Sequence, residues 1–77
     1  MKVKILKLES KLFDGEASSL TLPSELGQIT ILQNHISILT KLTKGKITVK
    51  NGSESKEFEI TSGVCNFANN LASVILY

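Results

Sequence analysis

The sequence predicts an all-β protein, a small flattened β-sandwich of short, mainly antiparallel strands. Three observations indicate this fold class. Apolar and polar residues alternate along most of the chain, and the apolar ones do not recur at the three- and four-residue spacing of a helix. Turn-forming pairs separate the alternating runs, and only three residues are alanine, the strongest helix former. Short strands divided by turns at this spacing are typical of small sandwiches and barrels.

The first predicted strand lies in residues 2–8, "KVKILKL". Val3 and Ile5 fall on one face of the strand, and lysines fall on the other. The alternation slips at Leu6, which predicts either a β-bulge or a strand that is covered on both faces. Val3 and Ile5 are therefore candidate core residues.

Two further signals predict a turn and a strand end. Asp14-Gly15 lies between two extended runs, and an Asp-Gly pair in that position predicts a tight turn. The run "SLTLP", residues 19–23, then alternates as far as Pro23. Because proline has no N–H to donate to a ladder, Pro23 should end this strand or confine it to the edge of a sheet.

Two β-hairpins are predicted in the C-terminal half. In residues 45–60, two alternating runs flank Asn51-Gly52, and Asn-Gly between alternating strands is a strong hairpin signal. Residues 63–77 predict two further strands joined at Asn69-Asn70, because asparagine accepts positive φ angles better than most residues. No long helix, linker or repeat is expected.

Length and composition limit the function classes. We expect the 77 residues to form one domain, residues 1–77, with a thin core that leaves little room for an enzyme cleft. No export signal opens the chain, and no stretch approaches the roughly 20 apolar residues that span a bilayer. An intracellular protein is therefore expected. All nine basic residues are lysine and only four residues are aromatic, which argues against a sequence-reading nucleic-acid protein.

The candidate residues for chemistry are His35 and Cys65, the only histidine and the only cysteine. A Cys-His pair suits nucleophilic catalysis when a carboxylate orients the histidine. No nucleophile elbow, glycine-rich oxyanion loop or phosphate-binding motif accompanies this pair, and one His with one Cys does not make a four-coordinate zinc site. We therefore predict no catalytic, metal or cofactor site, and we expect Cys65 to be a small buried apolar residue.

The segment 24–39, "SELGQITILQNHISIL", is the strongest candidate for a binding surface. Ile29 and Ile31 fall on one face of a predicted strand, and the opposite face carries no charge. One interpretation is an ordinary core strand with a polar outer side. The other is a surface for a protein partner, because charged residues are depleted from protein interfaces. The charge pattern gives the two interpretations roughly equal weight.

The segment 22–49, "LPSELGQITILQNHISILTKLTKGKITV", resembles the signature region of the ε subunit of F-type ATP synthase, called δ in mitochondria. The matching positions are Leu22, Pro23, Gly27, Ile29, Ile31, Leu32, Asn34, His35, Leu39, Thr40, Leu42 and Gly45. The segments "LFDGEASSLTLP" and "FEITSGVCNFANNLASVIL" resemble the flanking parts of the same pattern. Three positions depart from it: Thr30 replaces a glycine, Gln33 replaces a proline, and Ser62-Gly63 replaces two glycines.

The resemblance implies a β-sandwich at the base of the central stalk. Such a domain is a non-catalytic rotor subunit that binds the γ subunit, rests on the c-ring and helps couple proton translocation to ATP synthesis. By position in the motif, the c-ring contact would involve Gln28, Ile29, Thr30, Gln33, Asn34 and His35. The γ contact would involve Ser37, Ile38, Leu39 and Thr40. Gln28 stands where several relatives have an acidic residue, so hydrogen bonds would replace an ionic contact with the ring.

The resemblance also implies a location and an absence. Within the ATP synthase complex, the protein would be peripheral, on the cytoplasmic face of the bacterial plasma membrane, without direct membrane insertion. The sequence stops at Tyr77, where the family's sandwich ends and most bacterial members continue into an α-helical hairpin. Because that hairpin carries the family's nucleotide-binding motif, no nucleotide or other cofactor is expected to bind.

Two alternatives to a rotor subunit remain open. One is a stand-alone β-sandwich interaction module that binds a peptide or small ligand, for example by strand addition. It would be favoured if the charge-free C-terminal strand were an exposed edge. The other is an enzyme that uses His35 and Cys65, which requires an accessible, reactive thiol.

Overall fold

The computed structural model describes residues 1–77 and contains nine strands joined by turns and short loops. The predicted fold class, an all-β sandwich of short and mainly antiparallel strands, is confirmed. No helix able to cross a bilayer is present. The strands are β1 (Lys2–Lys7), β2 (Ser10–Glu16), β3 (Ser19–Ser24), β4 (Gly27–Leu32), β5 (Ile38–Leu42), β6 (Gly45–Asn51), β7 (Glu54–Ile60), β8 (Gly63–Ala68) and β9 (Leu71–Leu76).

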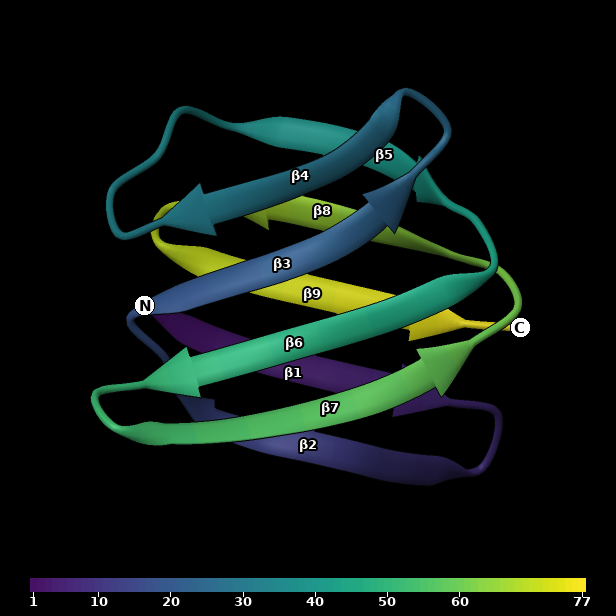
Figure 1. Cartoon of the computed structure of the whole chain (residues 1–77), viewed down its shortest axis with the longest axis horizontal. Coiled ribbons are helices and arrows are strands. Elements are labelled where there is room, and N and C mark those ends of the chain that lie inside the picture. Colours follow the sequence, from purple (N-terminus) through teal and green to yellow (C-terminus); the bar gives the residue numbers. More distant parts are fainter.

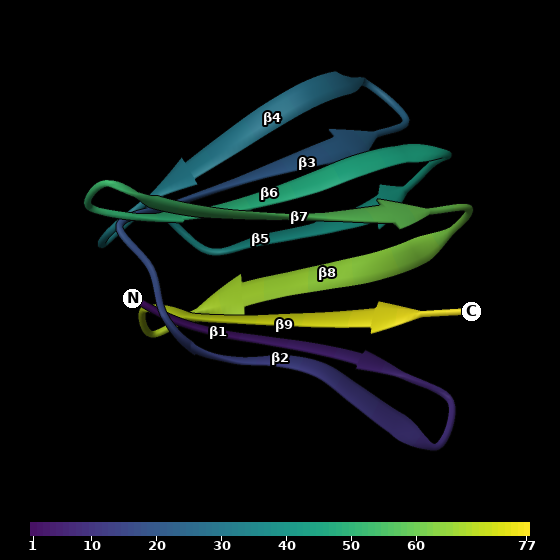
Figure 2. The same ribbon diagram turned by 60° about the horizontal axis from the view of Figure 1, so that its bottom comes forward.

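The strands form two stacked layers, which Figures 1 and 2 show from two directions. One layer has the order β2-β1-β9-β8-β5, and the other has the order β4-β3-β6-β7. The layers are joined where β5 pairs with β3 through Ser24 and Leu42. Only β1 and β9 run parallel to each other. The result is a curled sheet whose two faces meet around one core.

The core lies between the layers and contains 16 buried apolar residues. Alternate residues of the strands point inward, because successive side chains of a strand lie on opposite faces. Val3 and Ile5 are both fully buried, as predicted. Phe67 on β8 is the largest of the fully buried side chains. The seam between the edge strands β2 and β7 is covered by Phe13 and Phe58, whose rings meet edge to face at 6.1 Å.

The predicted turn at Asp14-Gly15 is wrong. Both residues lie inside β2 and pair with β1, and the chain instead turns at Leu8 and Glu9, where Glu9 has φ +64°. Glycine at position 15 has a packing role, since a Cβ there would lie 3.3 Å from the ring of Phe13. A glycine needed for close packing thus resembles a turn signal in the sequence.

The irregularity predicted at Leu6 is present, but the prediction for Pro23 is wrong. Strand β3 continues to Ser24 and lies between β4 and β6, so Pro23 neither ends the strand nor confines it to an edge. The β1–β2 register shifts between Ile5 and Leu6, which confirms the predicted bulge. The β3–β6 ladder ends at Thr21, whereas Pro23 pairs with β4 alone. On its other side, the Pro23 carbonyl accepts a hydrogen bond from the Thr43 amide. Pro23 therefore takes part in one ladder only, as its missing N–H requires.

Both predicted hairpins are confirmed. Asn69-Asn70 forms the two-residue turn between β8 and β9, with φ +52° and +59°, the positive angles that a type I′ turn needs at both positions. The β6–β7 turn is displaced by one residue from the prediction. Its two residues are Gly52 and Ser53, while Asn51 pairs with Glu54 at the end of the ladder. Gly52 has φ +64°, so glycine occupies the position that requires it.

Candidate interaction surface

Residues 33–37 form the loop between β4 and β5, at the end of the sandwich that also holds the β8–β9 turn (Figure 1). Asn34 adopts φ +60°, and its backbone N–H donates a 2.8 Å hydrogen bond to the side-chain oxygen of Asn70. The His35 backbone N–H donates to the Leu32 carbonyl at 3.2 Å. A side chain from one hairpin thereby holds the backbone of this neighbouring loop, which we call the 33–37 loop.

We expect Asn70→Ala to loosen the 33–37 loop and to lower the free energy of unfolding by about 2 kcal/mol. The change removes the acceptor for the Asn34 amide and places alanine at a positive φ. Asn69→Ala is the matched control, because Asn69 has a similar φ and its side chain makes no hydrogen bond to the loop. Hydrogen exchange of the Asn34 amide checks the prediction. Equal protection in both variants would show that Asn70 does not hold the loop.

The two residues that replace a glycine and a proline in the family pattern hold this region by side-chain hydrogen bonds. Gln33 accepts a 2.9 Å hydrogen bond from the Met1 ammonium, which also donates to the Ala17 carbonyl at 2.9 Å. The hydroxyls of Thr30 and Thr21 lie 3.1 Å apart across the β3–β4 ladder. Side-chain hydrogen bonds therefore act here where the family pattern has glycine, which frees the backbone, and proline, which restricts it.

The imidazole of His35 is exposed and oriented by two contacts. Its Nδ1 lies 2.8 Å from the Ile36 carbonyl oxygen. The ring also meets the edge of Phe67, with centroids 6.3 Å apart and planes at 72°. Since a carbonyl oxygen only accepts hydrogen bonds, Nδ1 is the donor and carries the proton. In the neutral ring, Nε2 then has a free lone pair.

Three large apolar side chains around the 33–37 loop are exposed to solvent. Leu32 is 57% exposed, Ile36 80% and Leu39 73%, and we call these three the apolar collar. Residues 26–40 contain no Asp, Glu, Lys or Arg. Exposed apolar side chains within a charge-free segment indicate a protein contact, because the centres of interfaces are depleted in charge.

The structure divides the predicted contact residues into outward-facing and inward-facing sets. Gln28 and Thr30 are exposed on the outer face of β4. Four residues of the 33–37 loop are exposed as well: Gln33, Asn34, His35 and Ser37. Leu39 also faces outward. The half-buried residues are Ile29, Ile38 and Thr40. Ile29 and Ile38 pack against the core, and Ile38 and Thr40 pair with the buried residues Phe67 and Cys65 of β8.

Two members of the apolar collar, Leu32 and Ile36, are not among the predicted contact residues. Leu32 lies on the outer face of β4, beyond Gln28 and Thr30. The sequence signal for Leu32 is that an apolar residue stands on the strand face that the alternation assigns to solvent. Ile36 follows no alternating pattern, because it belongs to a loop. Its exposure depends on the path of that loop, which no local pattern specifies.

The structure argues against chemistry at Cys65. Its side chain is fully buried in the core, and burial raises the pKa of the Cys65 thiol to about 11. A reactive cysteine needs the opposite environment, one that lowers the pKa of the thiol and leaves it accessible. The prediction of a buried apolar cysteine is confirmed. No three His, Cys, Asp or Glu side chains lie close enough together to hold a metal ion.

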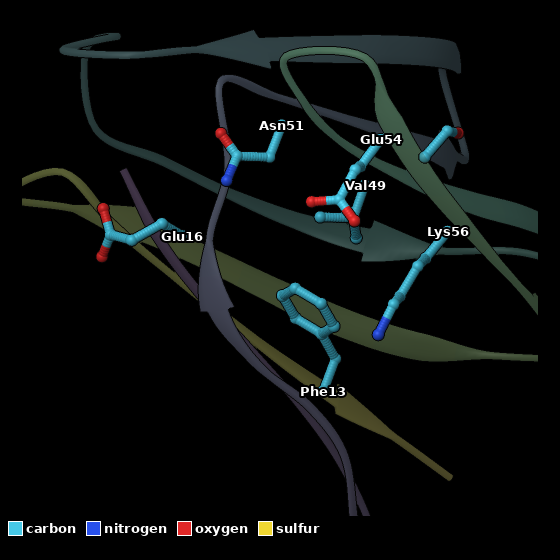
Figure 3. Close-up of a pocket in the computed structure, with 7 residues that line it drawn as sticks. Phe13, Glu16, Val49, Asn51, Glu54 and Lys56 are labelled. Carbon is cyan, nitrogen blue, oxygen red and sulfur yellow. The ribbon is translucent and has the colours of Figure 1, made fainter.

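A small hollow lies at the seam between β2 and β7 (Figure 3). The Phe13 ring lies in it, with the Lys56 ammonium 5.6 Å from the ring centroid. Its volume is about 160 Å³, below the roughly 300 Å³ at which ligand pockets begin. A wider hollow of about 520 Å³ on the outer face of β3 and β6 has no apolar wall. Neither has the mostly apolar lining of a small-molecule site.

The condition that favoured a peptide-binding module is not met. The charge-free C-terminal strand β9 pairs with β1 on one side and with β8 on the other. An added strand needs unpaired backbone groups along an exposed edge. Strand β9 therefore offers no free edge to which a peptide could add. The free edges of the sheet belong to β2, β7 and β4, and most of β5 is also unpaired on the side away from β8, because it meets β3 only at Leu42.

Comparisons with known proteins agree on one family. The family described as "ATP synthase, Delta/Epsilon chain, beta-sandwich domain" matches residues 1–76. The ATP synthase epsilon chain of Endomicrobium trichonymphae is 32% identical over 74 residues, which are 96% of this chain and 54% of that protein. The epsilon chain of Caulobacter vibrioides is 40% identical over 55 residues, 71% of this chain and 64% of that protein. The chain thus spans about half to two thirds of these curated relatives.

Two solved structures share the fold. A chain in the cryo-EM structure of the Euglena gracilis mitochondrial ATP synthase matches with a TM-score of 0.89 and 14% identity, covering 96% of this chain and 48% of that one. A chain in the central stalk/c-ring structure of the Tetrahymena thermophila mitochondrial ATP synthase matches with a TM-score of 0.79 and 20% identity, covering 97% and 61%. At these identities the likeness establishes the fold alone.

Proposed function

The chain belongs to the family of ATP synthase delta/epsilon β-sandwich domains, and from this membership we propose that it is a non-catalytic rotor subunit. In this role it binds the γ subunit, rests on the c-ring, and helps couple proton translocation to ATP synthesis. Its location would be the cytoplasmic face of a bacterial plasma membrane, as a peripheral part of the complex. The epsilon-chain names of the curated relatives support this role.

The observation that carries the proposal is the exposed apolar collar in the charge-free segment 26–40. The thin core buries most other aliphatic side chains of the strands, whereas Leu32, Ile36 and Leu39 remain in water around a single loop. Full burial of a large apolar side chain stabilises a protein by roughly 1.5 to 3 kcal/mol, and this free energy is not gained while the three side chains are exposed. A partner that covers them would recover this free energy on assembly.

We assign the two partners to neighbouring parts of this end. The c-ring would meet the outer face of β4 and the 33–37 loop, through Gln28, Thr30, Gln33, Asn34 and His35. The γ subunit would meet the start of β5, where Ser37 and Leu39 are exposed. Ile29, Ile38 and Thr40 would act mainly by packing beneath the contact, since their side chains are only half exposed.

Binding to purified γ tests the proposal. We expect a stoichiometric complex at micromolar concentration, and we expect Leu39→Lys to weaken it at least about tenfold, because a lysine would be buried without a partner. Leu26→Lys is the matched control. Leu26 is 95% exposed and lies in the β3–β4 turn, at the opposite end of the sandwich.

Each outcome decides between the proposed interface and another. If wild type and γ form no complex at micromolar concentration, the rotor function is wrong. If Leu26→Lys weakens binding as much as Leu39→Lys does, γ binds elsewhere on the sandwich. Thermal unfolding of both variants should match that of wild type, because both leucines are exposed.

A further inference from the structure

We propose that His35 recognises an uncharged hydrogen-bond donor of the c-ring through its Nε2 atom, and that protonation of the imidazole breaks this contact. The inference rests on the proposed function, in which the 33–37 loop faces the c-ring. It adds the chemical class of the c-ring group that lies opposite His35, and a dependence of the contact on pH.

The geometry leaves Nε2 as the one free polar atom of the imidazole. Nδ1 is used within the loop, on the Ile36 carbonyl at 2.8 Å. The edge-to-face contact with Phe67 limits rotation of the imidazole. Nε2 has no hydrogen-bond partner within the chain. Because Nδ1 carries the proton, Nε2 accepts hydrogen bonds in the neutral imidazole and requires an N–H or O–H group opposite it.

The surroundings offer no compensation for a positive imidazolium. The strands β4, β8 and β9 contain no Asp, Glu, Lys or Arg, and the buried Cys65 thiol stays neutral. On β5 the only charged residue is Lys41, which pairs with Glu25 at 3.8 Å. The other charges at this end are the Met1 ammonium, which donates to Gln33, and Glu16, 4.0 Å from that ammonium. Lys2 lies opposite Leu71 beside the β8–β9 turn, and Lys50 and Glu54 lie beside the β6–β7 turn. None of these groups forms an ion pair with His35.

The same surroundings indicate that the partner group is uncharged. A lysine or arginine of the c-ring would lose its hydration beside Leu32 and Ile36 without meeting a carboxylate. Burying such an unpaired charge is costly. A hydroxyl, an amide N–H or a backbone N–H meets an acceptor nitrogen without this cost. The contact should therefore depend little on ionic strength.

Protonation changes Nε2 from an acceptor into a donor, so that two donors face each other across the interface. Histidine is the side chain that changes charge between about pH 8 and pH 5. The neutral form binds, so the contact is complete at the upper end of this range and is lost as the pH falls. Losing one buried hydrogen bond weakens binding by about tenfold.

The test measures binding of the γ-bound chain to detergent-purified c-ring at about pH 7.5 and about pH 5.5. We expect wild type to bind about tenfold more weakly at the lower pH. His35→Gln is the conservative variant, because its side-chain oxygen offers a neutral acceptor near the place of Nε2. Its affinity should change less than about twofold between the two pH values. Binding to γ alone, measured for both proteins, should not depend on His35.

The outcomes separate this inference from the proposed function. Equal wild-type affinity at both pH values, or the same loss in His35→Gln, overturns the role of Nε2. An NMR measurement that finds the neutral proton on Nε2 in the free chain overturns it independently. Absence of ring binding at both pH values, with γ binding intact, rejects the ring contact of the 33–37 loop itself.

Discussion

Replacing Phe67 by alanine is expected to lower the free energy of unfolding by about 3 to 5 kcal/mol. Phe67 is the largest fully buried side chain, and it lies in β8 between Ile38 of β5 and Ala72 of β9. Removing the ring leaves a cavity where three strands meet, and the neighbouring backbones cannot close it without breaking their ladders. A domain of 77 residues has a total stability of about 4 to 12 kcal/mol. The substitution would therefore remove about a quarter or more of the total stability.

Urea denaturation followed by circular dichroism measures this effect, with Phe58→Ala as the matched control. Phe58 is only half buried, at the seam between β2 and β7, so its loss should cost about 1 to 2 kcal/mol. Phe67→Leu should keep the fold and remove the edge contact with His35. Equal costs for the two alanine variants would mean that the core is not centred on Phe67.

The core could be predicted from the sequence because alternation alone assigns residues to the inner face. Val3 and Ile5 follow this rule, and so do Leu20 and Leu22 of β3, all of them fully buried. The pairing of strands could not be predicted in the same way. β1 and β9 run parallel although they come from opposite ends of the chain, with Lys2 opposite Leu71, and no local pattern specifies so distant a partner.

Turns can be predicted where the residue type itself decides the backbone angle. Asn69 and Asn70 adopt positive φ angles, as asparagine tolerates. The turn at Glu9 has no such signal, because glutamate rarely adopts the φ of +64° found there. Gly15 misleads the prediction, since close packing against Phe13 uses the same residue type as a turn. A glycine in the sequence therefore does not show whether it is required for a turn or for close packing.

The candidate surface is located by the family pattern and by the absence of charge, whereas its internal bonds are not predictable. The Asn34 amide meets Asn70, and Gln33 meets Met1, so each bond joins residues more than 30 positions apart. Such bonds depend on how the two layers bring loops together. They explain how Gln33 can stand where the family pattern has a proline.

Gly63→Ala is expected to destabilise the protein by about 3 kcal/mol, at the upper end of the cost of overpacking. Gly63 is the second residue of Ser62-Gly63, where the family pattern has two glycines. It lies in β8 between Leu42 of β5 and Leu76 of β9. A Cβ at this position would lie 2.6 Å from the Ile75 carbonyl oxygen and 2.9 Å from Cδ2 of Leu76. The carbonyl belongs to the backbone of a paired strand, so β9 must shift to make room.

Gly52→Ala is the matched control, because its cost has a different cause. Gly52 has φ +64°, and no atom lies within 4 Å of the place that a Cβ would take, so alanine there should cost only about 1 kcal/mol of backbone strain. Urea denaturation compares the two variants, and hydrogen exchange of the β9 amides shows where the change acts. Gly63 lies at the end of β8 opposite the 33–37 loop (Figure 1). The folded fraction of Gly63→Ala should therefore bind γ with wild-type affinity, and weaker binding would mean that β9 transmits the shift to the loop.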